Sequence, residues 1–181
     1  VMGPRQVGKT TLVKALIGEM GAENWEYITL DDQAQFEIAQ ADPVGFIRNL
    51  PPKRIALDEV QRLPELFVSI KQAVDEQRTA GRFLLTGSAN ALLLPRLSDS
   101  LAGRMESVRL TTLSECEIHG RPPSFLSKLL NQEAPSAQDI RVRDHLLQRL
   151  ITGCFPEPLQ RANERRSTAW YQQYLGTLIQ R

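Results

Sequence analysis

The chain has 181 residues, of which 41% are hydrophobic and 24% charged, and its formal net charge is +1. These values are typical of a folded globular protein and exclude collagen-like, low-complexity and disordered classes. The length predicts one domain with an appendage. No apolar run approaches the ~20 residues that cross a bilayer, and Cys116 and Cys154 form no metal-binding or disulfide pattern. We therefore expect a soluble, cytoplasmic protein without a membrane partner.

Apolar periodicity predicts alternating strands and helices in the first part of the chain. A helix begins near Lys9, directly after a glycine-bearing loop. Short apolar runs at 25–30, 54–57 and 83–85 are typical of buried strands, and 106–110 is the expected last strand. Strands that alternate with helices predict an α/β fold with a mostly parallel sheet.

The pattern changes after residue 113, where apolar residues recur at helical spacing and predict an α-helical appendage. Tyr171 and Tyr174 favour a place in its core over a base-stacking platform. Residues 141–181 hold seven basic and three acidic side chains. A solvated helical face is the favoured interpretation of this charge, and a weak nucleic-acid phosphate contact is the alternative.

The strongest functional signal lies at the start of the chain. The motif G-x-x-x-x-G-K-[ST] is matched at every fixed position by one segment, which reads Gly3, Pro4, Arg5, Gln6, Val7, Gly8, Lys9 and Thr10. Backbone N–H groups of such a loop surround a β-phosphate, and the following helix N-terminus adds roughly half a positive charge. We expect Lys9 to bind β- and γ-phosphate oxygens and the Thr10 hydroxyl to ligate Mg²⁺. Thr11 completes the expected nucleotide-binding segment, and Arg5 is a further candidate phosphate contact.

Two acids directly follow the apolar run 54–57. Downstream of a phosphate-binding loop, Asp58 is predicted to hold Mg²⁺ and Glu59 to orient and activate an attacking water. Such general-base assistance is typically worth ~10²–10⁴ in rate. The alternative is two solvent-facing acids at the end of a strand.

Two weaker signals follow. Ligands bind outside the C-terminal ends of parallel strands, so Thr86 or Ser88 is expected to face the γ-phosphate, with Asn90 as a polar alternative. A plain turn would explain the same residues. Arg104 is expected either to act as an arginine finger toward a neighbouring copy in a homo-oligomer or to form an ion pair with Glu106.

Five segments together resemble consecutive motifs of a known family. They read GPRQVGKTTL, ALDEVQRLPELF, FLLTGSAN, LAGRMESVRLTTLSECE and ITGCFPEP, and they are similar to prokaryotic AAA-type ATP-binding proteins, the AAA domain family numbered 14. The resemblance implies a three-layer P-loop NTPase core with an additional strand between those that bear Lys9 and Asp58. It also implies ATP and Mg²⁺ as cofactors. Gly3, Gly8, Lys9 and Thr10 would form the Walker A site, Asp58 and Glu59 the Walker B pair, Thr86 or Ser88 the sensor and Arg104 the arginine finger.

Members of this family join the core to an uncharacterised, restriction-endonuclease-like C-terminal domain. By this resemblance we expect an ATPase core at 1–113, a helical appendage at 114–169 and the start of the C-terminal domain at 170–181. Only two residues precede Gly3, so we expect the P-loop strand to be nearly absent and the chain to be a fragment.

The predicted function is ATP–Mg²⁺ binding and ATP hydrolysis that switch the conformation of an attached effector domain. A nucleotide-gated signalling scaffold with little turnover is one alternative. An ATP-dependent nucleic-acid-processing protein is another.

Overall fold

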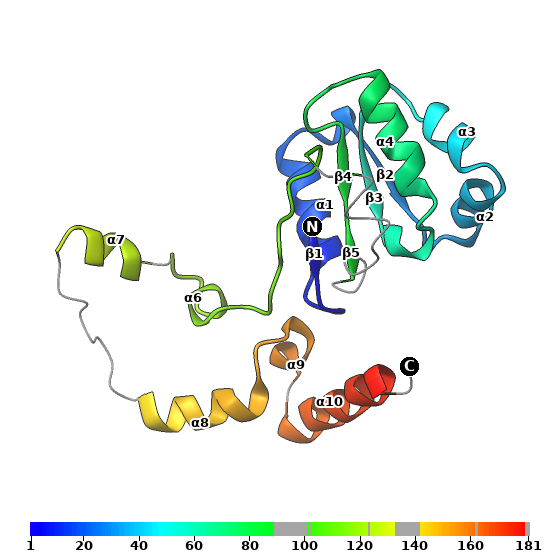
Figure 1. The fold of residues 1–181 in the computed structure, drawn as a ribbon. Coiled ribbons are helices and arrows are strands. Elements are labelled where there is room, and N and C mark those ends of the chain that lie inside the picture. The colour runs from blue at the N-terminus through cyan, green and yellow to red at the C-terminus, as the bar shows by residue number, and fades with distance from the viewer. Residues whose placement is uncertain (89–100, 102, 123, 133–141, 162, 180–181) are drawn as a thin grey trace. The chain divides into compact units, whose positions relative to one another are not determined.

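A computed structural model describes residues 1–88, 101, 103–122, 124–132, 142–161 and 163–179. The chain divides into two compact units, Val1–Thr111 and Thr112–Arg181. Figure 1 shows the helices and strands of each unit.

The first unit alternates strands and helices. Its strands are β1 (Met2–Gly3), β2 (Trp25–Thr29), β3 (Arg54–Asp58), β4 (Phe83–Leu85) and β5 (Gly87–Ser88). Its helices are α1 (Lys9–Glu19), α2 (Gln33–Ala41), α3 (Pro43–Arg48) and α4 (Leu66–Glu76), with 3₁₀ turns η1 (Ala22–Asn24) and η2 (Val60–Arg62). Local chemistry sets the helix starts. The Asp32 carboxylate caps α2, and the Asp42 carboxylate caps α3 directly before Pro43.

Every pairing between these strands is parallel. β3 pairs with β2 on one side and with β4 on the other, whereas β1 pairs with β5. Only Thr86 separates β4 from β5, so the same stretch of chain passes from one sheet to the next. The strand after α4 therefore lies between β1 and β3, which is the additional-strand arrangement that the family resemblance implied. The predicted α/β class is confirmed.

The predicted last strand, 106–110, forms a single parallel bridge between Arg109 and Met2. The Met2 N–H donates to the Val108 carbonyl at 2.8 Å, and the Leu110 N–H donates to the Met2 carbonyl at 2.7 Å. The segment thus lies beside β1. It does not extend into a full strand because β1 offers only two residues to pair with.

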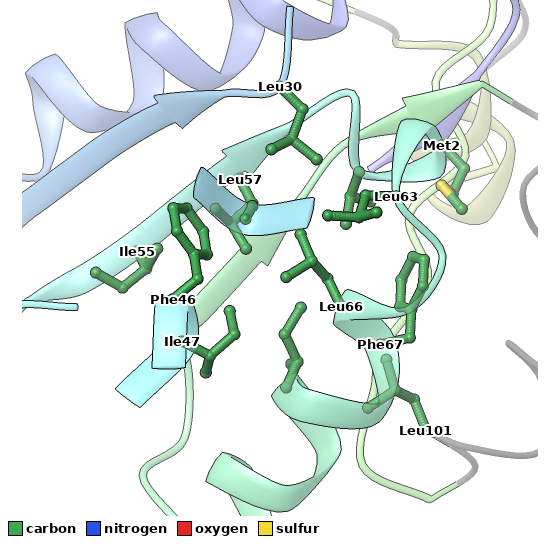
Figure 2. Packing of buried hydrophobic residues seen from close by; sticks show 13 residues of the cluster. Met2, Leu30, Phe46, Ile47, Ile55, Leu57, Leu63, Leu66, Phe67 and Leu101 are labelled. Atoms are coloured by element: carbon green, nitrogen blue, oxygen red, sulfur yellow. The ribbon is translucent and has the colours of Figure 1, made fainter. Parts of the chain in front are cut away.

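Side chains of the sheet alternate between two helical layers. Figure 2 shows Ile55 and Leu57 of β3 among residues of α3 and α4, including Phe46 and Leu66. Ala56 lies on the opposite face, in a cluster with α1. Burying side chains such as Leu57 contributes ~1.5–3 kcal/mol each. The helices therefore cover the sheet as three layers, with α1 on one face and α2, α3 and α4 on the other (Figure 1).

The second unit is helical over its described residues. It contains α6 (Glu115–Ile118), α7 (Phe125–Leu130), α8 (Val142–Thr152), α9 (Pro156–Gln160) and α10 (Glu164–Ile179). Ser114 and Glu117 form a capping box at the start of α6. The predicted boundary between residues 169 and 170 falls inside α10. In the described part of the chain, no helix is long and apolar enough to cross a membrane.

An aromatic cluster joins α9 and α10 within this unit. Trp170 is buried and stacks on Tyr174 with ring centroids 5.0 Å apart, and Phe155 contacts both rings. The Tyr171 hydroxyl donates to the Thr152 carbonyl at 2.9 Å. Tyr171 and Tyr174 therefore take part in packing, as the sequence favoured.

Candidate functional site

The alternation of side chains along the strands places several polar groups together at one edge of the sheet. Ala56 and Leu84 face α1, so Asp58 and Thr86, two positions further along their chains, lie toward the same face. Because β3 and β4 are parallel, their carboxyl ends meet at one edge. The hydrogen bond that the Thr10 hydroxyl donates to Asp58 places the start of α1 at the same edge.

The loop before α1 depends on its two motif glycines. Gly8 caps α1 with φ +95°, in the left-handed region that favours glycine. A Cβ on Gly3 would lie 2.2 Å from the carbonyl oxygen of Leu110, so the close approach there excludes a side chain. Val7 is buried and anchors the loop, whereas Arg5 and Gln6 are exposed.

Lys9 lies beneath this loop with only 5% of its surface exposed. Its Nζ donates to the carbonyl oxygens of Pro4 at 2.8 Å and Gly3 at 3.2 Å. Burial lowers the pKa of the Lys9 ammonium, the nearby Glu59 and Asp58 carboxylates oppose that shift, and Arg5 adds to it. The carbonyl groups of Gly3 and Pro4 therefore offset part of the cost of burying the Lys9 ammonium, and a bound anion would stabilise this cation further.

Asp58 is the centre of the site and is 3% exposed. Its Oδ2 accepts hydrogen bonds from the Thr10 and Tyr27 hydroxyls, both at 2.7 Å, and its Oδ1 accepts one from the Thr86 hydroxyl. Carboxylate and hydroxyl oxygens are the hard ligands that Mg²⁺ prefers. The donor set of Thr10 and Asp58 therefore fits the metal that the sequence predicted for these two residues.

Glu59 follows Asp58 in a left-handed conformation, with φ +58°. Its N–H donates to the Thr86 hydroxyl at 3.2 Å, and the next N–H, of Val60, donates to the Thr86 carbonyl at 3.0 Å. The Glu59 carboxylate accepts a hydrogen bond from Nε2 of Gln61. Neighbouring groups therefore orient both the backbone and the side chain of Glu59.

The two sensor candidates occupy different environments. Thr86 is fully buried, and its hydroxyl donates to Asp58 and accepts a hydrogen bond from the Glu59 N–H. Ser88 is half-buried, and its N–H donates to Oε1 of Gln61 at 3.3 Å. Thr86 thus supports the two acids, which leaves Ser88 the better sensor candidate. Asn90 lies outside the described residues.

Arg104 forms an ion pair with Asp75 of α4, where the sequence had indicated Glu106. Its Nε lies 2.6 Å from Oδ1 of Asp75, and a second guanidinium nitrogen lies 3.2 Å from Oδ2. This bidentate contact lowers the pKa of the Asp75 carboxyl. Arg104 is thus held against α4 within this chain.

Sequence reasoning missed two residues of the site, Tyr27 and Gln61. Tyr27 lies in the middle of β2, where an aromatic residue is unremarkable, and burial together with its bond to Asp58 raises the pKa of its hydroxyl. Gln61 lies in η2, two positions after Glu59. Motif spacing does not reveal either role, because both depend on sheet register or side-chain direction.

The fold and the site together define the P-loop NTPase class. Residues 1–119 match the model of the family described as AAA domain, and the chain belongs to that family. Its relatives include proteins of Mycobacterium bovis and Mycobacterium tuberculosis, both described as uncharacterized. Each is 35% identical over 149 residues, which cover 76% of this chain and 32% of the relative. The chain thus spans about a third of the length of these curated relatives.

Proposed function

We propose that this chain binds ATP with Mg²⁺ and hydrolyses the β–γ phosphoanhydride. The observation that supports the proposal is the meeting of four groups at one sheet edge: Lys9 beneath the loop, Thr10 on Asp58, and Glu59 directly after it. Nucleotide binding agrees with membership of the AAA domain family.

Lys9 and the start of α1 provide the phosphate site. The ammonium would exchange its loop carbonyl partners for β- and γ-phosphate oxygens, and the first N–H groups of α1 add the positive end of the helix dipole. Thr10 and Asp58 would hold Mg²⁺. The metal, when bound, offsets negative charge on the phosphate oxygens.

Glu59 provides the base in this scheme. Its carboxylate would accept a proton from water while the water oxygen forms a bond to the γ-phosphorus and the bond to the β–γ bridging oxygen breaks. The products are ADP and inorganic phosphate. A positioned base contributes ~10²–10⁴ in rate.

The P-loop contacts the segment of chain that leads into the second unit. Leu110 contacts Gly3 through its carbonyl and donates its N–H to Met2, and the second unit begins only two residues later. A change in the loop on nucleotide binding would therefore move this segment. This supports the proposal that the ATPase switches the conformation of attached helices and of an effector domain.

Steady-state phosphate release tests the proposal. We expect Lys9→Ala to abolish ATP binding and turnover, and Glu59→Gln to retain ATP while turnover falls ~10²-fold or more. Lys53→Ala and Glu37→Gln, at exposed positions, serve as matched controls. Phosphate release undiminished by both site variants would defeat the assignment.

A scaffold with little turnover is the second candidate, in which the contact with Gln61 would instead keep the Glu59 carboxylate from accepting a proton. It predicts ATP retained after gel filtration, a change in oligomeric state and no multiple turnover. Ready multiple turnover by the isolated chain would exclude it.

A further inference from the structure

Gln61 uses both ends of its side-chain amide. Its Nε2 donates to Oε2 of Glu59, and its Oε1 accepts the N–H of Ser88 at 3.3 Å. An amide with a donor partner at one end and an acceptor partner at the other has a fixed orientation. Gln61 therefore links the carboxylate of Glu59 to the backbone of β5.

The link extends to the phosphate-binding loop. Ser88 lies opposite Gly3 in the parallel pairing of β5 with β1, and Gly3 is the first residue of the Walker A motif. The connected path therefore runs from Glu59 through Gln61 and Ser88 to Gly3. It joins the proposed base to the strand that positions the phosphates.

The backbone of Glu59 alone does not fix its carboxylate. Thr86 accepts hydrogen bonds from the N–H groups of Glu59 and Val60, and these hold Glu59 in a left-handed conformation that is unfavourable for a non-glycine residue. The side chain of a glutamate still has several rotatable bonds, and fixing it costs conformational entropy. The Gln61 amide supplies a contact that selects one orientation.

We propose that Gln61 is a positioning residue for hydrolysis, which orients the Glu59 carboxylate and ties its place to the P-loop strand. The proposal rests on the function proposed above, in which Glu59 receives the proton of the attacking water. A displacement of a reacting group by ~1 Å can cost ~10²-fold in rate. Loss of Gln61 should therefore reduce the rate of the chemical step and leave nucleotide binding intact.

The test compares turnover with binding in two variants of the 181-residue chain. Gln61→Met removes both hydrogen bonds at nearly the same side-chain length. Gln61→Glu keeps an acceptor for Ser88 but places a carboxylate against Glu59. We expect both to lower kcat by ~10–100-fold. Gln61→Met adds no charge near Lys9 and should change the Kd for a non-hydrolysable ATP analogue by less than ~2-fold.

A double variant separates positioning from a structural role. In a Glu59→Gln background the base is already lost, so adding Gln61→Met should lower kcat no further. The matched control is Gln33→Met, which removes a 2.7 Å glutamine-to-glutamate hydrogen bond on exposed α2. It should leave kcat and Kd unchanged.

The outcomes also separate this proposal from the function on which it rests. An active parent chain whose Gln61→Met and Gln61→Glu variants keep the parental kcat would overturn the positioning role alone. A further fall in kcat in the Glu59→Gln background would do the same. A parent chain that binds the analogue and releases no phosphate would overturn both proposals. If Gln61→Met does not fold, Gln61→Glu provides the comparison of kcat.

Discussion

The Thr10 hydroxyl donates a 2.7 Å hydrogen bond to Oδ2 of Asp58, although 48 positions separate the two residues in the chain. Thr10 lies in the first turn of α1 and Asp58 ends β3. Two motifs that are distant in sequence are therefore in direct contact in the folded chain.

Asp58→Asn should weaken the magnesium-dependent part of nucleotide binding. The amide keeps the shape of the side chain but loses the negative charge that attracts a divalent cation. We expect affinity for a non-hydrolysable ATP analogue to fall ~10–100-fold with Mg²⁺ and to change little in EDTA. Titration calorimetry in both buffers measures the difference, with exposed Asp31→Asn as the control. Equal losses in the two buffers would argue against a metal ligand.

Tyr27→Phe should destabilise the fold without removing the aromatic ring. The variant deletes a 2.7 Å hydrogen bond to the buried Asp58 carboxylate, and a bond to a charged group contributes ~1.5–3 kcal/mol. We expect the free energy of unfolding in urea to fall by ~1–3 kcal/mol. In an Asp58→Asn background the same substitution should cost less. An equal cost in both backgrounds would place the effect elsewhere than in this bond.

Gly3→Ala and Gly18→Ala should change stability in opposite directions. A Cβ at Gly3 meets the backbone oxygen of Leu110 at 2.2 Å, so the loop or segment 108–111 must shift. Gly18 lies on the exposed surface of α1 with nothing within 4 Å of an added Cβ. Alanine there should stabilise the helix by ~0.5–1 kcal/mol. Thermal unfolding compares them, and an unchanged Tm for Gly3→Ala would contradict the close approach.

Asp75→Asn and Arg104→Ala separate the structural role of Arg104 from its predicted catalytic role. Both variants break the ion pair between them, so both should lower stability slightly at neutral pH. Only Arg104→Ala should lower kcat, by ~10³-fold or more, if the guanidinium serves a neighbouring copy as an arginine finger. Equal kcat values for the two variants would mean that Arg104 has a structural role, through its contact with α4, and no catalytic one.

The same pair gives a prediction for acid. Arg104 holds the pKa of Asp75 below its ordinary value of 3.8, so the folded state binds its proton less readily than the unfolded state. The stabilisation is therefore present above pH 3.8 and is lost as the pH falls through the lowered value. Denaturant unfolding should show parent and Asp75→Asn chains converging at low pH. A difference that persists in strong acid would assign the effect to another interaction.

Most of the fold could be predicted from the sequence because its signals are local. Apolar runs identified β2, β3 and β4, and glycine spacing located the start of α1. The parallel order and the additional strand followed from the alternation of strands with helices and from the family resemblance. The segment 106–110 differed because strand length depends on the partner, and β1 offers only two residues.

The sequence by itself determined the residues of the phosphate loop and the two acids at the end of β3, Asp58 and Glu59, since their chemistry follows from residue type and spacing. Only the tertiary structure decided which groups meet them. Tyr27 reaches Asp58 from a neighbouring strand, Gln61 turns back onto Glu59, and Arg104 contacts Asp75 rather than the acid nearest in sequence. Sheet register and side-chain direction set these contacts, and both arise from packing across the whole unit and leave no periodic signal in the sequence.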